Sequence, residues 1–425
     1  MEKKYTNYAI RMASCLLTVC MAGAGAGAQS YQTPAQKLMI SPEDSLNRSA
    51  PKNRTVISGY GSAFYQRDVN AQQSTMTLER AVLFVGHQFN ERIAFFSELE
   101  VENAKVASGE DGSGEVSMEQ AYLRFNLNPR QYLVAGLFVP RIGILNENHL
   151  PPNFNGVERP IVETVVIPAT WRELGIGFYG SSDRLPLNYS VAVVNGLNSA
   201  GFEHGSGIRE GRAEGSNAMA NNLALTASVQ YLAGDFKFQA SGYFGGTVGL
   251  SKGGADSLHV GLESGAFGTP LYLGEGDMQY AHAGWSAKAL FAYIAYPGAD
   301  KIYSDYGSNI ASGMWGGYAE LAYDWLHRRQ MTQQLVSFVR MEALDLNSGL
   351  SDLQKQDDQY DGTLKQTQLI AGIGYLPIPN VVIKADVRLL HTGPQNAALV
   401  INLPPNARPY RQNDQFLNLG IGYSF

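Results

Sequence analysis

Charged side chains of both signs occur in the long stretch 140–170, and an arginine follows just beyond it. Carboxylate and guanidinium groups that share a segment can pair with one another and can attract or repel charged solutes. The chemistry that this pattern predicts is electrostatic recognition without bond breaking. The residues that we expect to carry it are Arg141, Glu147, His149, Glu158, Arg159, Glu163 and Arg172.

Patterns that would support covalent catalysis are weak. The tetrapeptide His-Gly-Ser-Gly at 204–207 places a serine between glycines, as a nucleophile elbow does. It lies in a predicted loop, without the strand, turn and helix that such an elbow requires, so we interpret it as coincidence. No triplet of serine, histidine and acid stands out elsewhere in the sequence. We therefore predict no catalytic residue and no enzymatic activity.

Metal-binding patterns are equally weak. The seven histidines are scattered singly, with no pair at the spacing of a metal site. Four aspartates between 352 and 361 match no known cation loop, and we interpret them as part of a solvated loop. The sequence thus predicts no metal site and no cofactor.

The elements that position these residues are predicted to be β-strands. Residues Phe416–Phe425, FLNLGIGYSF, alternate between bulky apolar side chains and small or polar ones, and the chain stops on an aromatic residue. A strand with one face for lipid and one for a polar interior is typical of β-barrels in a bacterial outer membrane. A soluble secreted β-protein is the alternative, but it would not keep aliphatic side chains facing outward around a whole barrel.

The first 28 residues are predicted to be a cleaved export signal. Two lysines and an arginine precede the apolar stretch 12–22, and the small residues at 22–28 offer a cleavage site after Ala28. The apolar stretch is shorter than the roughly 20 residues that span a bilayer. Both cysteines, Cys15 and Cys20, lie in this segment. A lipoprotein signal ending at Cys20 is a poor alternative, because a bulky valine precedes that cysteine.

Composition agrees with a barrel whose surfaces alternate: 44% of residues are apolar and 11% aromatic, but only 16% are charged. Removing residues 1–28 takes away three basic residues and one acidic residue, so the formal net charge changes from −6 to −8. An acidic chain of this kind gives no indication of a nucleic-acid partner.

From Thr55 onward, segments of alternating polarity recur with an even count of sixteen, which predicts an all-β fold: a transmembrane antiparallel β-barrel spanning 55–425. Residues 29–54 lack this alternation and are predicted to form a flexible periplasmic lead-in. Short connectors alternate with long ones, as periplasmic turns alternate with outer loops. The predicted strands are 55–66, 76–88, 92–102, 116–126, 131–139, 171–180, 187–195, 222–232, 236–247, 272–282, 284–296, 313–325, 333–344, 365–376, 381–391 and 414–425.

Sixteen strands enclose an opening too wide for side chains alone to fill, so a segment must fold inward if the lumen is to be narrowed. The best candidate is the third outer loop, 140–170, which is long for an ordinary connection and contains five prolines. Its apolar residues at 161–167 favour burial inside the barrel. The alternative is a loop that packs on the rim.

At this stretch the chain resembles the phosphate-selective porin O and P family of outer-membrane channels. The similar segments are AYLRFNLNP at 121–129, AGLFVPRIGILNENHLPPNFNGVERP at 135–160 and IPATWRELGIGFYG at 167–180, with weaker similarity at 97–102 and 338–345. The resemblance implies a 16-stranded trimeric porin whose third outer loop bends into the lumen. It also implies a ladder of arginines and a cluster of lysines along the pore, and this chain departs from that pattern.

The alternation assigns charged residues to the lumen on other walls. Strand 92–102 directs Glu98, Glu100 and Glu102 inward, whereas Phe95, Leu99 and Val101 face outward. Strand 76–88 is apolar on both faces, so Glu79 and Arg80 receive no face. Neighbouring lumen charges that neutralise one another are the alternative to a selective acidic wall. The basic candidates for the pore lining are Arg124, Lys288, Arg340, Lys384 and Arg388.

Opposite charges on different walls of a narrow aqueous pore create a transverse field. We therefore expect an outer-membrane porin that lets small hydrophilic solutes or ions diffuse, either generally or with weak selectivity. A phosphate- or anion-selective porin is the alternative, if Arg141, Arg159 and Arg172 dominate; a barrel hydrolase is a remote one. The expected partners are outer-membrane lipid, the barrel-assembly machinery through the strand ending at Phe425, and two further copies in a homotrimer. Tyr318, Tyr323, Trp325, Tyr375, Tyr423 and Phe425 are predicted to form aromatic girdles.

Overall fold

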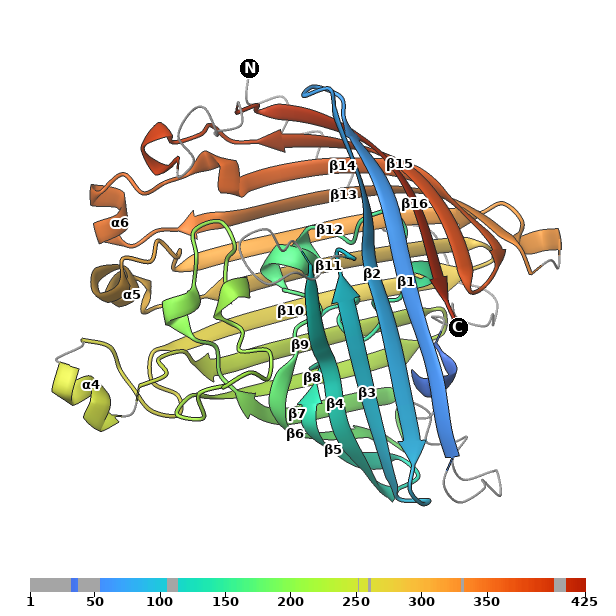
Figure 1. The fold of residues 1–425 in the computed structure, drawn as a ribbon, viewed down its shortest axis with the longest axis horizontal. Helices are drawn as coiled ribbons and strands as arrows, with labels where there is room; N and C mark the ends of the chain where they lie inside the picture. Colours follow the sequence, from blue (N-terminus) through green and yellow to red (C-terminus); the bar gives the residue numbers. More distant parts are fainter. Residues whose placement is uncertain are drawn as a thin grey trace.

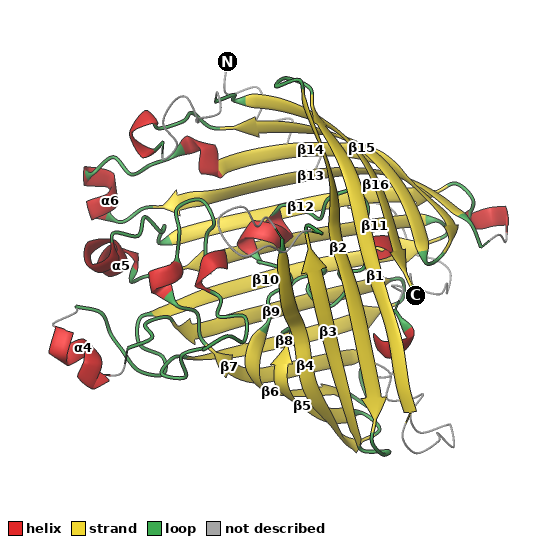
Figure 2. Ribbon diagram, in the orientation of Figure 1, coloured by secondary structure: helices red, strands yellow, loops and turns green. Residues whose placement is uncertain are grey.

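Sixteen antiparallel strands close into one barrel in the computed structural model, with β1 paired to β16 (Figures 1 and 2). The structure describes residues 32–36, 54–104, 114–250, 252–258, 261–329, 332–400 and 410–425. The strands are β1 (Arg54–Asp68), β2 (Gln73–Gln88), β3 (Ile93–Glu102), β4 (Glu115–Asn128), β5 (Gln131–Phe138), β6 (Glu173–Ser181), β7 (Leu187–Asn195), β8 (Leu223–Ala233), β9 (Phe236–Gly246), β10 (Pro270–His282), β11 (Trp285–Ala295), β12 (Gly313–Asp324), β13 (Gln334–Gly349), β14 (Lys365–Ile378), β15 (Val381–Thr392) and β16 (Asn413–Ser424).

All sixteen predicted strands are present, and the predicted fold class is confirmed. The segment expected at 272–282 is β10, although its glycines blur the alternation. β13 continues to Gly349, five residues beyond the predicted end. Among the described residues, no helix combines the length and the hydropathy that membrane crossing by a helix requires.

The alternation of polarity follows the two faces of the barrel wall. Along β16, Leu417, Leu419 and Ile421 are 46%, 56% and 56% exposed on the outside, whereas Asn418 is 3% exposed on the inside. The period of two along a strand produces this segregation. One predicted girdle residue is wrong: Tyr318 faces inward and is 6% exposed, because it lies one position out of phase with the outward residues of β12.

The connections differ in length at the two ends of the barrel. The helices α4 (Lys252–Leu258), α5 (Ala299–Tyr306) and α6 (Asp352–Gln356) lie in long loops at one end, on the left in Figure 1. Short turns join the strands at the other end, towards which the C-terminus lies. Two of the long loops matter below: L3, residues 139–172 between β5 and β6, and L4, residues 196–222 between β7 and β8.

L3 folds into the barrel, as the sequence predicts (Figure 1). Its short turn η1 (Pro151–Asn153) contacts β1, β15 and β16, whereas its second turn η2 (Val162–Val166) contacts β11, β12 and β13. These strands lie across the barrel from β5 and β6, where L3 begins and ends, so the loop crosses the lumen.

Burial of apolar side chains explains why L3 folds inward. Val162, Val166, Ile167 and Trp171 are 0% exposed and pack in a cluster with residues of the strands. Each buried aliphatic side chain of this size contributes roughly 1.5–3 kcal/mol relative to exposure. An extended position above the rim would lose this stabilisation.

A short piece of the predicted lead-in is also buried. Thr33 and Ala35 are 0% exposed, and the backbone N–H of Ala35 donates to Ser58 Oγ at 3.2 Å. Ala35 packs in one cluster with Tyr60 and Leu150. Residues 32–36 of the predicted lead-in thus pack against the barrel, where the small side chain of Ala35 fits. The predicted signal 1–28 and the rest of the lead-in up to residue 53 lie outside the described residues.

Candidate functional site

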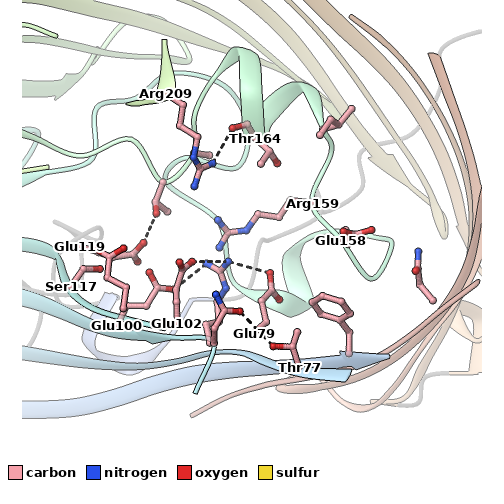
Figure 3. Close-up of a pocket in the computed structure, with 18 of the residues that line it drawn as sticks. Thr77, Glu79, Glu100, Glu102, Ser117, Glu119, Glu158, Arg159, Thr164 and Arg209 are labelled. Atoms are coloured by element: carbon pink, nitrogen blue, oxygen red, sulfur yellow. Dashed lines mark hydrogen bonds and ion pairs between the residues drawn. The ribbon is translucent and has the colours of Figure 1, made fainter. Parts of the chain in front are cut away.

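A cavity of about 500 Å³ occupies the lumen on the outer side of L3 (Figure 3). Strands β2, β3 and β4 form one side of it, and residues of L3 and L4 form another. Charged side chains of both signs line it. Among the described residues, every basic side chain in the lining is an arginine.

The wall formed by β2 and β3 carries an excess of negative charge. Arg80 contacts three carboxylates: Glu79 Oε1 at 3.1 Å, Glu100 Oε1 at 3.1 Å and Glu102 Oε1 at 3.6 Å. One guanidinium cannot neutralise three carboxylates. We call Glu79, Arg80, Glu100 and Glu102 the acidic wall.

Two β-bulges place additional carboxylates on the lumen side. On β2, Ser62 pairs with Arg80 and Ala63 pairs with Leu78, which leaves Glu79 as the extra residue. On β4, Glu98 pairs with Gln120 and Leu99 pairs with Met118, which leaves Glu119 as the extra residue. A bulge locally breaks the alternation of faces and redirects a side chain.

The opposite side of the cavity carries an excess of positive charge. Arg172 and Arg212 share one carboxylate, with nitrogens 2.6 Å and 2.7 Å from the Glu214 oxygens. Arg209 donates to the carbonyl oxygen of Thr164 at 3.1 Å. We call Arg159, Arg172, Arg209 and Arg212 the basic wall; Figure 3 shows Arg159 and Arg209 across from Glu100 and Glu102.

Arg159 of L3 projects into the cavity (Figure 3). It donates to the carbonyl oxygen of His149 at 3.4 Å. Among the described residues, no carboxylate oxygen lies within 4.0 Å of a guanidinium nitrogen of Arg159, which is the limit for an ion pair. Its guanidinium therefore faces the cavity without a salt bridge to any described carboxylate.

Several of the predicted pore-lining cations hold L3 in place. Lys384 Nζ donates to the carbonyl oxygen of Phe154 at 2.8 Å, and Lys288 Nζ to that of Asn153 at 3.0 Å. Arg388 pairs with Glu158 at 2.5 Å. Arg340 lies between Glu320 at 3.3 Å and Glu342 at 2.8 Å and also donates to the Asn155 carbonyl.

Arg124, Arg141 and Glu147 lie away from the cavity. The Arg124 guanidinium stacks 3.9 Å from the ring centroid of Tyr132. Arg141 Nε pairs with Glu147 Oε2 at 2.7 Å. Of the three arginines on which the anion-selective alternative depends, Arg159 and Arg172 line the cavity and Arg141 does not.

Glu163 stabilises the fold of L3 itself and is fully buried. It accepts hydrogen bonds from the backbone N–H groups of Ile144 and Leu145 at 2.8 and 2.6 Å, and from the Tyr318 hydroxyl at 2.6 Å. Burial raises the pKa of Glu163 to about 7. The same effect, desolvation of a charged form, lowers the pKa of the buried His149 to about 4.

The structure divides the predicted site residues into two groups. Those that line the cavity are Glu100, Glu102, Glu158, Arg159, Arg172, Arg340 and Arg388. Those placed elsewhere are Glu98, Arg124, Arg141, Glu147, His149, Glu163, Lys288 and Lys384.

Sequence reasoning missed Glu119, Arg209, Arg212 and Glu214. Glu119 was not predicted because it is the extra residue of a β-bulge. Two adjacent polar residues in a strand can indicate such a bulge. The charged run at 203–214 was the available signal for L4.

Comparison with known proteins gives one relative and many similar folds. No family model matches the chain. An uncharacterized protein of Aquifex aeolicus is 32% identical over 349 residues, which cover 79% of this chain and 75% of that protein. The outer membrane channel DcaP of Acinetobacter baumannii has a TM-score of 0.54 at 12% identity, covering 89% of this chain and 99% of that chain.

Two further solved structures have the same fold. OprB of Pseudomonas putida has a TM-score of 0.52 at 8% identity over 88% of this chain and 94% of that chain. An anion-selective porin from Comamonas acidovorans has a TM-score of 0.50 at 11% identity over 88% of this chain and 100% of that chain. These likenesses show that the chain has the barrel fold of outer-membrane porins.

Proposed function

We propose that this chain, which belongs to the same family as the uncharacterized Aquifex aeolicus protein, is an outer-membrane porin with general or weak selectivity. Small hydrophilic solutes and ions would diffuse passively through its lumen. The observation that carries this proposal is a charged cavity inside a closed barrel. The acidic wall and the basic wall of this cavity face each other where L3 narrows the lumen.

A lumen with this charge arrangement favours small polar solutes. The field between the two walls orients dipolar molecules as they pass. Large apolar solutes would lose hydration without gaining a matching surface, because the lining offers mainly carboxylates and guanidinium groups. Ions of either sign meet both attraction and repulsion, so strong selectivity is not expected.

Phosphate or anion selectivity is the second candidate, and Arg159 favours it because its charge is not paired. Two observations weigh against it. Arg172 already pairs with Glu214, and Arg141 pairs with Glu147 outside the cavity. An anion would also pass the acidic wall. Membership of the phosphate-selective porin O and P family remains part of this second candidate.

The setting that we propose follows from the same features. The chain would be exported by a signal at 1–28, inserted by the barrel-assembly machinery through the strand ending at Phe425, and surrounded by outer-membrane lipid on its apolar face. We also propose a homotrimer, which chemical crosslinking of the purified protein in detergent would test. The barrel hydrolase stays a remote alternative, to be tested by release of fatty acid or peptide.

Liposome swelling tests the diffusion proposal directly. Proteoliposomes should swell in isotonic solutions of a pentose and of a small zwitterionic amino acid, whereas a large oligosaccharide should not enter. Liposomes with heat-denatured protein are the control for leakage. Swelling in none of the small solutes would contradict an open channel, and swelling only in anionic solutes would favour the second candidate.

A further inference from the structure

Three ionisable residues from separate elements meet beside the acidic wall, where β3 and β4 face L3. Ligand atoms of Glu98, Glu119 and His149 all lie within 4.8 Å of one another. His149 Nε2 is 3.0 Å from Glu98 Oε1 and 3.8 Å from Glu119 Oε2. All three side chains are buried, with exposures of 0%, 0% and 1%. We call them the EEH group.

Nearby basic residues neutralise the negative charge of the EEH group only in part. In the described part of the chain, no arginine or lysine nitrogen lies within 4.0 Å of the Glu98 carboxylate. Arg172 Nη1 is 3.7 Å from Glu119 Oε1, but that guanidinium also pairs with Glu214 at 2.6 Å. A buried carboxylate without a positive partner is costly, so a proton or a cation is required here.

The hydrogen bonds of His149 point to the same conclusion. Its Nδ1 lies 3.0 Å from the carbonyl oxygen of Asn146, which can only accept, so Nδ1 carries the hydrogen. A neutral imidazole with its hydrogen on Nδ1 presents a lone pair at Nε2. That lone pair faces the Glu98 carboxylate at 3.0 Å, which places two acceptors in contact.

Two buried polar atoms at this position have no hydrogen-bond partner among the described residues. One is Glu119 Oε2, the oxygen that approaches His149 Nε2. The other is the hydroxyl of Tyr60, whose ring packs 5.7 Å from that of His149. A buried polar atom without a partner calls for an explanation, and a bound ion is one.

The remaining oxygens of both carboxylates are held by neighbours. Gln120 Nε2 donates to Glu98 Oε2 at 2.6 Å, and the Thr170 hydroxyl donates to Glu119 Oε1. Partners of this kind orient metal-ligating side chains and fix the histidine tautomer. The free oxygens, Glu98 Oε1 and Glu119 Oε2, are thereby directed at His149 Nε2.

We propose that Glu98, Glu119 and His149 bind a divalent transition-metal ion, with Zn²⁺ as the reference ion, which ties L3 to the barrel wall. One imidazole nitrogen and two carboxylate oxygens form a ligand set that suits zinc and its neighbours. Ligands about 2.1 Å from such an ion lie roughly 3.0–3.5 Å apart. The distances of 3.0 and 3.8 Å from Nε2 require only small shifts to reach this range.

The consequence for the channel is mechanical. His149 belongs to L3, whereas Glu98 and Glu119 belong to β3 and β4, so the ion would crosslink the narrowing loop to the wall that faces it. A proton shared within the EEH group is the rival explanation, because it would also relieve the contact between acceptors.

Metal binding to the folded protein in detergent separates these explanations and does not depend on transport. Untagged protein is stripped with EDTA, dialysed and titrated with Zn²⁺ by calorimetry. The structure predicts one site per chain, weakened roughly tenfold or more by Glu98→Gln and by His149→Gln. Glu98→Gln keeps a side chain of the same shape, so it removes the charge and leaves the packing.

His204→Gln is the matched control, because His204 also contacts a carboxylate, Asp361 at 3.2 Å, but only one. It should leave the affinity unchanged. Should a variant fail to fold, X-ray absorption of the zinc-loaded wild type decides: one imidazole with oxygen ligands supports the site. No stoichiometric binding, binding that Glu98→Gln leaves unchanged, or a shell without a single imidazole would overturn the proposal in favour of a shared proton.

Discussion

Arg159 and Arg80 show how pairing decides what a charged residue does in this lumen. Arg80 is enclosed by three carboxylates and mainly balances the acidic wall. Arg159 has a hydrogen bond to a backbone carbonyl and extends into the cavity. Its field therefore acts on solutes more strongly than that of a paired arginine.

Replacement of Arg159 by glutamine should shift the channel towards cations. The loss of one unpaired charge at the narrowing changes the barrier for a monovalent ion by about 1 kcal/mol, or roughly fivefold in the permeability ratio. The reversal potential across a KCl gradient measures this ratio. Arg130→Gln, in an exposed turn where Arg130 pairs with Asp183, is the control and should leave the ratio unchanged.

Glu163 should give L3 a pH-dependent contribution to stability. Its pKa is raised from 4.5 to about 7 in the folded protein, so the contribution is fully present below about pH 4.5 and is lost as pH rises through 7. The full effect is about 3 kcal/mol. Glu163→Gln cannot ionise, so its unfolding temperature should rise relative to wild type between pH 5 and pH 8. If the difference in unfolding temperature between Glu163→Gln and wild type stays the same across that pH interval, Glu163 does not have this role.

The sequence could predict which residues of regular strands face inward, but not which of them meet. Glu100 and Glu102 were assigned to the lumen by alternation and line the cavity. Glu119 was not assigned to the lumen because a bulge locally reverses the alternation. The EEH group was not predicted because its members are 21 and 30 residues apart in the chain. Only the path of L3 brings His149 to the wall formed by β3 and β4.

At the scale of the element, L3 depends on a strand that leaves room for it. Gly420 and Gly422 on β16 face the loop: a Cβ at Gly422 would lie 2.4 Å from Pro151 Cβ, and one at Gly420 would lie 2.9 Å from Val157 Cγ1. The backbone of L3 is also held by the wall, since Val157 N donates to Asp386 Oδ2 at 2.6 Å.

Gly422→Ala should displace L3 and destabilise the barrel by about 1–3 kcal/mol, the usual effect of overpacking. The measurements are the unfolding temperature in the heat-modifiable gel shift and the single-channel conductance, both of which should change. Gly274→Ala is the control, because no heavy atom lies within 4 Å of a Cβ at that position. Equal behaviour of the two variants would mean that β16 does not position L3.

The bulge on β2 predicts an asymmetric response to deletion. Deletion of Glu79 should restore regular pairing between β1 and β2, so the barrel should still fold, with one carboxylate fewer at the cavity. Deletion of Val85, in the regular part of the same strand, moves the residues on one side of it to the opposite face and should abolish folding. The gel shift reports both outcomes. Loss of the barrel in the Glu79 deletion would contradict the assigned bulge.

The strands were predictable because membrane barrels impose a period of two over many segments. The strand ends were less predictable. β13 extends five residues beyond its predicted end, to Gly349, which pairs with Gly313 of β12 beyond an irregularity, whereas its pairing with β14 ends at Asp345. The inward path of L3 was predictable from its prolines and apolar residues, but its anchors were not, since each joins residues more than 100 positions apart.

At the scale of the whole molecule, closure of the barrel determines what the charges can do. Because β1 pairs with β16, the lumen is bounded on all sides, and the acidic and basic walls must face each other across it. Neither sign dominates the narrowing. We therefore expect a water-filled channel in which the opposed charges leave only weak selectivity.

The most direct test is the reversal potential of the purified protein in a planar bilayer across a KCl gradient, repeated with phosphate added. We predict stable channels with weak selectivity or a mild preference for cations, and no block by phosphate. Strong anion preference with block by phosphate would contradict it and would assign the pore to Arg159 and the basic wall.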